Sequence, residues 1–458
     1  MDFVHRPYQP GSTIAAIASP SGEGGVAIIR ISGNAALDIA AKVFSGPIHT
    51  YRSHTAHFGK IRNAGGQVID EVLCLPMLAP KSYTGEDTVE IQCHGGSLIT
   101  RRVLETILEA GARAAEPGEF TFKAFTNGKL DLAQAEAVQE LIGAKNELAL
   151  EQAEQQLQGV LSKKISSFQK QLVAIAAILN AWVDFPEEGL EFASLEEVIL
   201  SLSQTLDQMK QLSATFHEGK ILSNGLSLCL VGRPNVGKSS LMNALLGKDR
   251  AIVTPIAGTT RDLLEDDLRL GKLHFRLIDT AGIRKTDEVI EKEGIRRSMQ
   301  AMERADLILL VLDASSELCV ETQEFISLAP KQKTILIWNK IDLPHVALSD
   351  FGFEYSVPIS AKTADGLDAL RGTIDQFIWR KGSPGKEDVV ITKLRHKQAL
   401  DQASEFLETL IAGLKDGVSA EFLSSDMHAT LSELGTIIGT NITEDILNAI
   451  FSKFCIGK

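Results

Sequence analysis

The spacing of apolar residues divides the chain into stretches with different predicted secondary structure. From residue 13 to about residue 125, short apolar runs alternate with glycine-rich turns, as in residues 26–31 and 89–93. Runs of this length bounded by turn residues predict strands. The apolar stretch of residues 97–108 ends before Gly111 and predicts a helix with a C-terminal glycine cap. This part of the chain is predicted to be a mixed α+β domain.

A helical pattern follows in two separate pieces. From residue 130 to about residue 213 the chain is rich in Ala, Leu and Gln and poor in Gly and Pro, with a break at residues 185–189. This composition is typical of an all-α domain. Helical periodicity returns over residues 397–414 and again toward Phe451. We infer that the final segment packs back onto the first helices.

Between the helical pieces, short buried-type strands alternate with helix candidates, which is the pattern of a doubly wound α/β sheet. The chain is therefore predicted to be multidomain, with an α/β domain inserted into a helical one. The strand candidates are residues 226–231, 273–279, 306–313, 334–338 and 355–359. The predicted boundaries are 1–125 for the N-terminal domain, 126–223 and 385–458 for the two parts of the helical domain, and 224–384 for the inserted domain.

Composition and charge narrow the class of protein. The 458 residues are 44% hydrophobic and 23% charged, which is ordinary for folded globular domains. The formal charge of −13 provides no general basic field for nucleic acid, so any RNA contact must be local. The N-terminus has no signal-peptide pattern, and the apolar run 307–312 is too short to cross a bilayer, so we expect a cytoplasmic protein with no membrane contact. The five scattered cysteines predict reduced thiols.

The inserted domain carries a phosphate loop. Residues 232–239 read GRPNVGKS and lie between a predicted strand and an apolar helix that begins near Ser240. In such a loop the backbone N–H groups face a phosphate, and Lys238 can reach the β- and γ-phosphates. The Ser239 hydroxyl can bind Mg²⁺.

Three further motifs indicate a guanine nucleotide. The DTAG run, Asp279 to Gly282, follows a strand and is suited to sense Mg²⁺ and the γ-phosphate, while Thr260 is a natural second magnesium ligand. The NKID run places Asp342 where its carboxylate accepts from the ring N–H and the amine of guanine, which adenine does not offer. The following SAK run, from Ser360, would supply the last base contact. These motifs in order predict a GTP-hydrolysing enzyme.

Many small GTPases have a glutamine directly after DTAG, and its side chain orients the attacking water. Here that residue is Ile283, which cannot orient water, so another group must assist hydrolysis. A cation can stabilise the charge that develops on the phosphoryl group, and the Asn235 amide oxygen offers such a cation a ligand. Potassium is a plausible occupant. The carboxylate that positions water is expected in the acidic stretch 287–293, whose alternative role is an ordinary solvated helix start.

Several distinctive motifs lie outside the inserted domain. They are the runs Gly11 to Ala18, Gly24-Gly25-Val26, Arg30 to Gly33, Tyr83 to Asp87, His94-Gly95-Gly96, Pro117 to Thr121, Asn127 to Glu136, and Phe451 to Lys458. With these motifs the chain resembles the MnmE (TrmE) family of tRNA-modification GTPases over essentially its full length. Because the motifs lie outside the nucleotide site, they separate this family from other bacterial GTPases.

The resemblance implies a homodimer held by N-terminal domains that bind a tetrahydrofolate derivative, the 5-formyl or methylene form. It also implies a complex with the flavoprotein MnmG, a heterotetramer. Together the two proteins would install an aminomethyl-type, carboxymethylaminomethyl group at C5 of the wobble uridine (U34) of certain tRNAs. GTP hydrolysis would depend on potassium and on G-domain dimerisation, and would drive conformational change and not the chemistry itself.

Residue roles follow from the same resemblance. The implied catalytic residue is Glu291, preferred to Glu288. Folate contacts are expected at Arg30, Glu90, Lys129 and Lys458, whose alternative role is that of surface ion pairs. Magnesium would be held by Ser239 and Thr260, and potassium by Asn235, Thr254, Ile256 and Thr259. The full set of GTP-binding residues is Asn235, Val236, Gly237, Lys238, Ser239, Ser240, Thr254, Pro255, Ile256, Ala257, Gly258, Thr259, Thr260, Asp279, Thr280, Ala281, Gly282, Asn339, Lys340, Asp342, Ser360, Ala361 and Lys362.

Other interpretations remain open at this stage. A ribosome-assembly GTPase switch would share the nucleotide motifs, but a basic RNA-binding appendage would be expected with it. Outer domains that act only as a dimer scaffold would bind no folate. Cys455 is either a nucleophile or a small buried thiol in a packed C-terminal helix. The stretch 393–396, KLRH, departs from the arginine- or asparagine-rich run common in the family, so no RNA contact is assigned to it.

Overall fold

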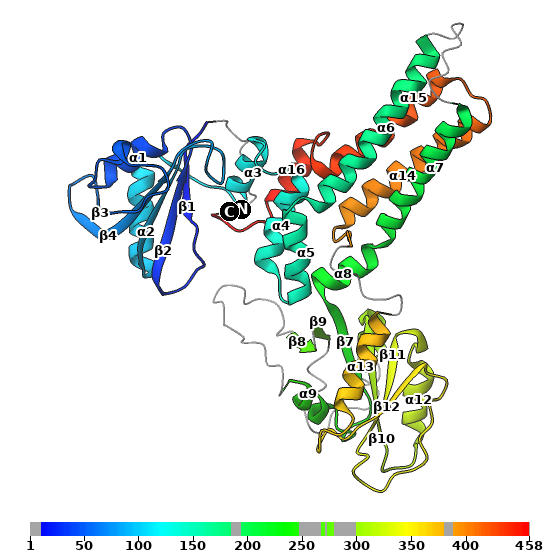
Figure 1. Ribbon diagram of the computed structural model, residues 1–458. Helices are drawn as coiled ribbons and strands as arrows, with labels where there is room; N and C mark the ends of the chain where they lie inside the picture. Colours follow the sequence, from blue (N-terminus) through cyan, green and yellow to red (C-terminus); the bar gives the residue numbers. More distant parts are fainter. Residues whose placement is uncertain are drawn as a thin grey trace.

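The computed structural model describes residues 11–184, 194–246, 267–270, 273–278, 299–379 and 388–457. Figure 1 shows an N-terminal α+β part in blue and cyan, a long helical part, and a second sheet in green and yellow. The fold class predicted from the sequence is confirmed, because two separate sheets flank a helical bundle. The residue numbers that divide the domains stay predictions.

The N-terminal sheet has the strand order β3-β4-β5-β2-β1-β6. Its pairs are antiparallel except for β1 and β6, which are parallel. Side chains alternate along each strand, so Ile29, Ile31 and Ile91 are buried on one face. The elements are β1 (Ile14–Ile17), β2 (Gly24–Ser32), α1 (Ala36–Val43), η1 (Ile48–Thr50), β3 (His57–Arg62), β4 (Val68–Met77), β5 (Thr88–Gly95), α2 (Ser97–Glu109) and β6 (Arg113–Ala114).

Helix α2 lies where the sequence predicted it, and it ends as predicted at a glycine. Gly111 has a φ of +121°, a backbone conformation that L side chains rarely adopt. The apolar side of the helix, with Val103 and Ile107, packs together with α1 against the sheet. The sheet is therefore covered by helices on this face.

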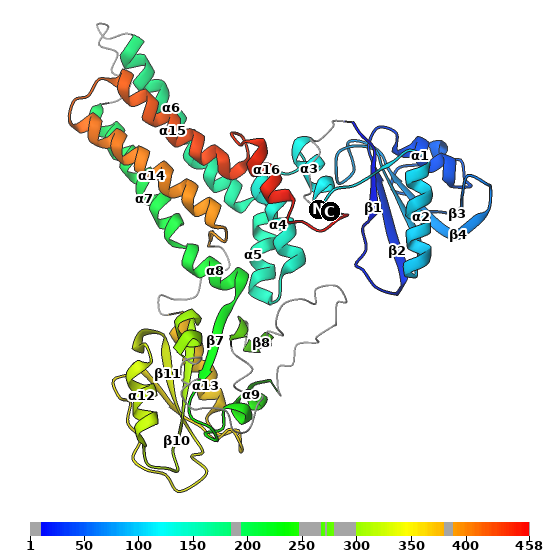
Figure 2. The same cartoon turned by 180° about the vertical axis from the view of Figure 1, so that it is seen from behind.

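The C-terminal end of the chain returns to the N-terminal part (Figure 2). The Phe122 ring of α3 (Glu119–Thr126) meets Phe451 of α16 (Glu444–Phe451) edge-to-face, with ring centroids 5.2 Å apart. The Gly118 N–H donates to the Cys455 carbonyl at 3.4 Å. The last residues that the structure describes are thus held beside α3.

The helical part is a bundle formed from the segments before and after the inserted domain, as inferred from the sequence. Helices α14 and α15 pack against α7 and α6, and their apolar faces share one core that includes Phe168, Leu202, Leu407 and Leu434. Helix α4 begins with a capping box between Asp131 and Gln134. The elements are α4 (Leu132–Gly143), α5 (Glu147–Leu157), α6 (Val160–Asp184), α7 (Leu195–Ala214), α8 (Phe216–Asn224), α14 (Leu394–Lys415), α15 (Ala420–Ile438) and α16. The predicted break at 185–189 lies outside the described residues. Among the described helices, none is long and apolar enough to cross a bilayer.

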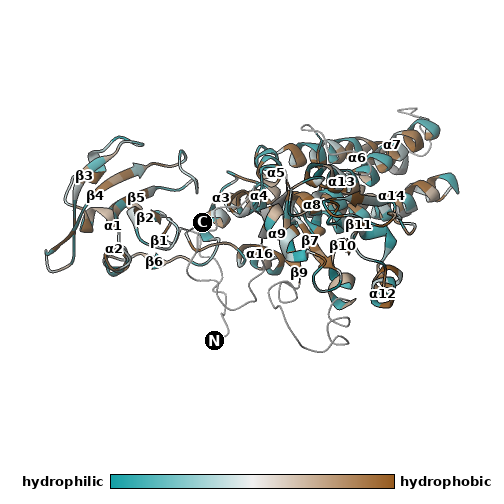
Figure 3. Cartoon of the chain, turned by 90° about the horizontal axis from the view of Figure 1, so that it is seen from below, coloured by the Kyte–Doolittle hydropathy of each residue, from teal (hydrophilic) through white to brown (hydrophobic). Residues whose placement is uncertain are grey.

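The inserted sheet has the strand order β12-β11-β10-β7-β9-β8. Its strands are parallel except for β8, an antiparallel edge strand that the sequence did not predict. Strands β7, β10 and β11 are almost continuously buried, and they appear brown in Figure 3. The elements are β7 (Leu226–Val231), α9 (Lys238–Leu246), β8 (Asp267–Leu270), β9 (Leu273–Ile278), β10 (Leu307–Asp313), α12 (Val320–Leu328), η2 (Lys331–Lys333), β11 (Thr334–Asn339), β12 (Tyr355–Pro358) and α13 (Leu367–Ile378).

The two crossings between the helical part and the inserted sheet lie side by side. The chain enters through α8 and returns through residues 389–393, where the Ile391 N–H donates to Thr215 Oγ1 at 3.0 Å. A Cβ placed on Gly219 of α8 would lie 2.1 Å from the Ile391 carbonyl oxygen, so the two segments touch through their backbones. Gln156 of α5 donates to Thr392 Oγ1 at 3.1 Å. We call these contacts the crossing junction.

Candidate functional site

The phosphate loop connects β7 to α9, which begins at Lys238, two residues before the predicted start. Gly237 has a φ of +96°, and a Cβ there would lie 2.2 Å from Asn339 Nδ2, so a side chain at this position would disrupt the loop. Asn235 also has a left-handed backbone, with a φ of 65°. The resulting turn directs the chain into the helix N-terminus, the geometry that places backbone N–H groups around an anion.

The Lys238 side chain curls over the loop. Its Nζ donates to the carbonyl oxygens of Gly232 and Arg233, each at 2.7 Å. Burial lowers the pKa of the Lys238 ammonium, because its charged form loses water. A phosphate anion in the loop would favour the charged form. The arrangement therefore presents a desolvated cation at the place where a polyphosphate is expected.

Asn339 connects the three loops of the nucleotide site. Its Nδ2 donates to the Val236 carbonyl at 2.8 Å, and its Oδ1 accepts from the Ala361 N–H at 2.9 Å. The side chain is only 2% exposed, so both hydrogen bonds are shielded from water. The phosphate loop and the 360–362 segment are thus held at a fixed separation.

The Asp342 carboxylate is exposed and oriented. The buried Ser360 hydroxyl donates to Asp342 Oδ1 at 2.7 Å. Ser360 Oγ also accepts from the Thr363 N–H at 3.2 Å. The sequence suggested Ser360 as a base contact, and the structure gives it a positioning contact with Asp342. Ser240 and Lys362 are exposed at the edge of the site.

A carboxylate that the sequence analysis did not single out lies between these motifs. Asp313, at the end of β10, accepts from Lys340 Nζ at 2.6 Å. Its other oxygen accepts from the Ser315 N–H and hydroxyl, at 2.9 and 2.7 Å. The sequence did contain a signal for Asp313, because it is an acidic residue at the end of an apolar strand. That end lies at the same sheet edge as the phosphate loop.

Several predicted site residues lie outside the described residues. They are Glu291, Thr254, Pro255, Ile256, Ala257, Gly258, Thr259, Thr260, Asp279, Thr280, Ala281, Gly282 and Lys458. Among the described residues no cluster of three His, Cys, Asp or Glu side chains that could hold a metal ion is present. Ser239 and Asn235 are exposed, so their oxygens suit a cation held jointly with nucleotide oxygens.

In the N-terminal part, Arg30 and Glu90 are register partners on β2 and β5. Arg30 Nη2 lies 2.8 Å from Glu90 Oε1, and both side chains are about four-fifths or more buried, at 15% and 14% exposure. The Arg30 guanidinium carbon lies 5.6 Å from the ring centres of both Tyr83 and Phe120. The Arg30–Glu90 ion pair is therefore partly desolvated, with its cation beside two aromatic rings, and it is not an exposed surface pair.

Of the other two predicted folate residues, Lys129 and Lys458, the structure describes Lys129. Lys129 Nζ donates to the Pro80 carbonyl at 3.0 Å, in the loop that also carries Tyr83. Gly457 packs against β1, where a Cβ would lie 2.2 Å from the Ile17 carbonyl oxygen.

Cys455 is an exposed free thiol, so the interpretation as a buried thiol is wrong. None of the five cysteines, all of which the structure describes, forms a disulfide.

The basic residues of the 393–396 stretch make internal contacts. Lys393 pairs with Glu140 at 2.9 Å, and Arg395 pairs with Glu136 at 2.9 Å. His396 is fully buried against the same Glu136 carboxylate. These side chains hold α4 to α14.

Comparison with known proteins agrees with this description across the chain. A family model described as the MnmE helical domain matches residues 132–455, and one described as the GTP-binding protein TrmE N-terminus matches residues 13–129. The chain is 63% identical over 458 residues to the tRNA modification GTPase MnmE of Protochlamydia amoebophila (strain UWE25), covering 100% of both chains. It is 42% identical to the protein of that name from Thermoanaerobacter pseudethanolicus, with 97% of this chain and 99% of the other covered.

Among solved structures, the G domain of the T. maritima FeoB iron transporter is 26% identical over 33% of this chain and 98% of that chain. Its TM-score of 0.24 is too low to support an inference about the whole molecule.

The fold and the nucleotide site define a P-loop GTPase, an enzyme that binds and hydrolyses GTP. The chain belongs to the MnmE family, since a family model matches more than half of it and a relative matches its full length.

Proposed function

We propose that this GTPase modifies the wobble uridine of certain tRNAs together with a flavoprotein of the MnmG type. The two would install a carboxymethylaminomethyl group at C5, using the one-carbon unit of a tetrahydrofolate derivative. The proposal is carried by the full-length match to a tRNA modification GTPase, which includes both parts outside the nucleotide domain. The proposed assembly is a homodimer that binds MnmG and tRNA in the cytoplasm.

In the proposed hydrolysis step, water attacks the γ-phosphate and the β–γ bridging bond breaks, giving GDP and phosphate. Lys238 and the N-terminus of α9 would hold the phosphates. Asp342, oriented by Ser360, would bind the guanine base. Ser239 would contribute to a magnesium site and Asn235 to a potassium site, with Glu291 orienting the water. Bound Mg²⁺ and K⁺ would offset the negative charge that develops on the phosphoryl oxygens.

Potassium dependence is tested by GTP turnover in matched potassium and sodium buffers. We expect potassium to raise kcat at least about ten-fold, and Asn235→Gly to abolish the difference. Glycine is the sharper substitution, because Asn235 has a φ of 65° and alanine would add backbone strain there.

Glu291→Ala should lower kcat by about 10² or more while GTP still binds, because the group that orients the attacking water is lost.

The control for Asn235→Gly is Ser327→Ala, which removes an exposed hydroxyl of α12, in the same domain, that no cation is expected to touch. Turnover that is independent of the cation in the parent protein would overturn the potassium proposal. It would also reopen the interpretation as a ribosome-assembly switch.

Folate binding would depend on the Arg30–Glu90 pair. A guanidinium can hold the folate glutamate carboxylate, and a carboxylate can accept from the pterin amine. We expect Arg30→Ala to weaken 5-formyltetrahydrofolate binding by about 10- to 100-fold, measured by calorimetry. Arg101→Ala is the matched control, because Arg101 is 76% exposed on α2. A protein that binds no folate at all would support the scaffold interpretation.

The complete activity is tested by reconstitution. The purified chain is combined with the flavoprotein, GTP, a tetrahydrofolate donor, glycine and unmodified tRNA, and the wobble nucleoside is analysed by mass spectrometry. A mass increase that requires all the components supports the proposal. GTP turnover without any change in the tRNA would contradict it.

A further inference from the structure

Asp313 is held as an acceptor of defined orientation. Ser315 occupies its Oδ1 with two hydrogen bonds, from the backbone N–H and the hydroxyl, while its Oδ2 accepts from Lys340 Nζ. Burial by itself raises the pKa of the Asp313 carboxyl, but the hydrogen bonds from Lys340 and Ser315 outweigh it and lower that pKa. The group is therefore a carboxylate at neutral pH, and its 16% exposure leaves it partly shielded.

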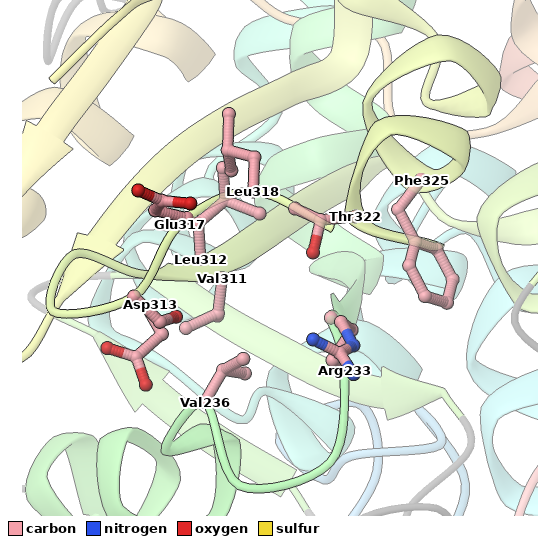
Figure 4. Close-up of a pocket in the computed structure, with 11 residues that line it drawn as sticks. Arg233, Val236, Val311, Leu312, Asp313, Glu317, Leu318, Thr322 and Phe325 are labelled. Carbon is pink, nitrogen blue, oxygen red and sulfur yellow. The ribbon is translucent and has the colours of Figure 1, made fainter. Parts of the chain in front are cut away.

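The position of this ion pair in the sheet relates it to the nucleotide. Strand β10 lies between β7, which leads into the phosphate loop, and β11, which leads into the NKID run. Asp313 is the register partner of Asn339, and it also lines a small hollow with Gly232 and Val236 of the phosphate loop (Figure 4). The Lys340 side chain consequently runs across the sheet edge from the base-reading loop toward the phosphate loop.

A nucleotide must span the same interval. Its base is read by Asp342, two residues after Lys340, and its phosphates lie over the loop that follows β7. A free lysine side chain populates many rotamers, and conformational entropy is lost when it is ordered against a ligand. Because Asp313 holds the Lys340 ammonium, the aliphatic part of the lysine side chain is already ordered and presents a preformed surface for the base. Less conformational entropy is then lost when the nucleotide binds.

We infer that Asp313 is a positioning residue for guanine-nucleotide binding, acting through Lys340. It holds the Lys340 side chain along the line between the base and the phosphates, so the stem forms one wall of the nucleoside site. Asp313 itself is not expected to touch the nucleotide.

The test is a double-mutant cycle with Asp313→Asn, Lys340→Met and the combined variant in the full-length protein. GDP association and dissociation are followed with a fluorescent GDP analogue. We expect Asp313→Asn to raise the dissociation rate about ten-fold in the parent protein, and less than about two-fold when Lys340 is already methionine. Affinity for inorganic triphosphate, which uses the phosphate loop alone, should change by less than about two-fold.

Two further variants keep the test decisive if Asp313→Asn also lowers stability. Ser315→Ala leaves the carboxylate in place but loosens it, and should raise the GDP dissociation rate by a smaller factor. Asp306→Asn removes a carboxylate that accepts from Ser227 at the start of β7, away from the nucleotide edge, and should leave GDP kinetics unchanged. An equal effect of Asp313→Asn in the Lys340→Met background, or no effect on GDP dissociation, would overturn the inference.

Discussion

Asp342→Asn should change the preferred base of the enzyme from guanine to xanthine. The carboxylate accepts from two N–H groups of guanine, whereas an asparagine amide offers one acceptor and one donor, and the donor matches the C2 oxygen of xanthine. A polar group left unpaired in a site built to pair it costs roughly 10⁴-fold in discrimination. Titration with GDP and XDP at fixed Mg²⁺ should show GDP affinity falling by about 10³-fold or more and XDP binding appearing.

Ser360 makes this substitution conservative in shape. Its hydroxyl donates to Asp342 Oδ1 at 2.7 Å and can donate equally to an asparagine carbonyl, so the side chain should keep its orientation. Asp350→Asn is the control, because Asp350 is exposed in the loop after the NKID run and its carboxylate accepts a local bond from the Gly352 N–H. An Asp342→Asn protein that still prefers GDP over XDP would show that the base is not read by this carboxylate.

The second large effect is expected on stability, at Glu136 of α4. This buried carboxylate accepts from Arg395 Nη2 at 2.9 Å and contacts His396 Nε2 at 2.8 Å. Arg395 in turn donates to the Thr436 carbonyl in the last turn of α15. Glu136→Gln would leave a shielded guanidinium without its counter-ion, a change that typically costs about 3–5 kcal/mol. Thermal unfolding followed by far-ultraviolet circular dichroism should therefore show an earlier transition of the helical part.

Acidification should reveal the same contact. Burial by itself raises the pKa of the Glu136 carboxyl, but His396 and Arg395 outweigh burial and lower that pKa from 4.5 to about 2. A carboxyl whose pKa is lower in the folded than in the unfolded state stabilises the fold above the unfolded value. This stabilisation is lost as the pH falls from about 4.5 toward 2, so the parent protein should lose stability over that range more steeply than Glu136→Gln.

Glu105→Gln provides the matched control for both measurements. Glu105 pairs with Arg101 four residues away on α2, but the two side chains are 50% and 76% exposed. Exposed pairs of this kind contribute about 0–1 kcal/mol, so the transition should hardly move. Equal shifts for Glu136→Gln and Glu105→Gln would mean that burial adds nothing to the Glu136 cluster.

The parts of the fold that the sequence predicted are those with strong local signals. Strands β7, β10 and β11 are buried on both faces, so each is a short continuous apolar run. Helix α2 combines apolar periodicity with a glycine stop. Strand β8 was missed because its sequence, DLRL, is four residues long and half charged, and it is a strand because it pairs with β9.

For the site, the phosphate loop and the NKID and SAK runs could be recognised because their function requires fixed residue types at fixed spacing. The groups that orient them could not. Lys340 meets Asp313 across 27 positions, and Arg395 meets Glu136 across 259 positions. Such contacts depend on which strands and helices become neighbours, and periodicity contains no information about that. The exposed position of Cys455 likewise follows from tertiary packing, since its local sequence is equally compatible with a core position.

The crossing junction makes the nucleotide domain a separable module. Because α8 and the returning segment, residues 389–393, meet at Thr215, Gly219 and Ile391, the helical bundle would need only a short loop to close if the domain were removed. Such a double attachment also opposes free rotation of the domain about either connection, because two neighbouring tethers have to turn together. Any rearrangement that GTP produces at the sheet edge would therefore reach the bundle through two connections at one place.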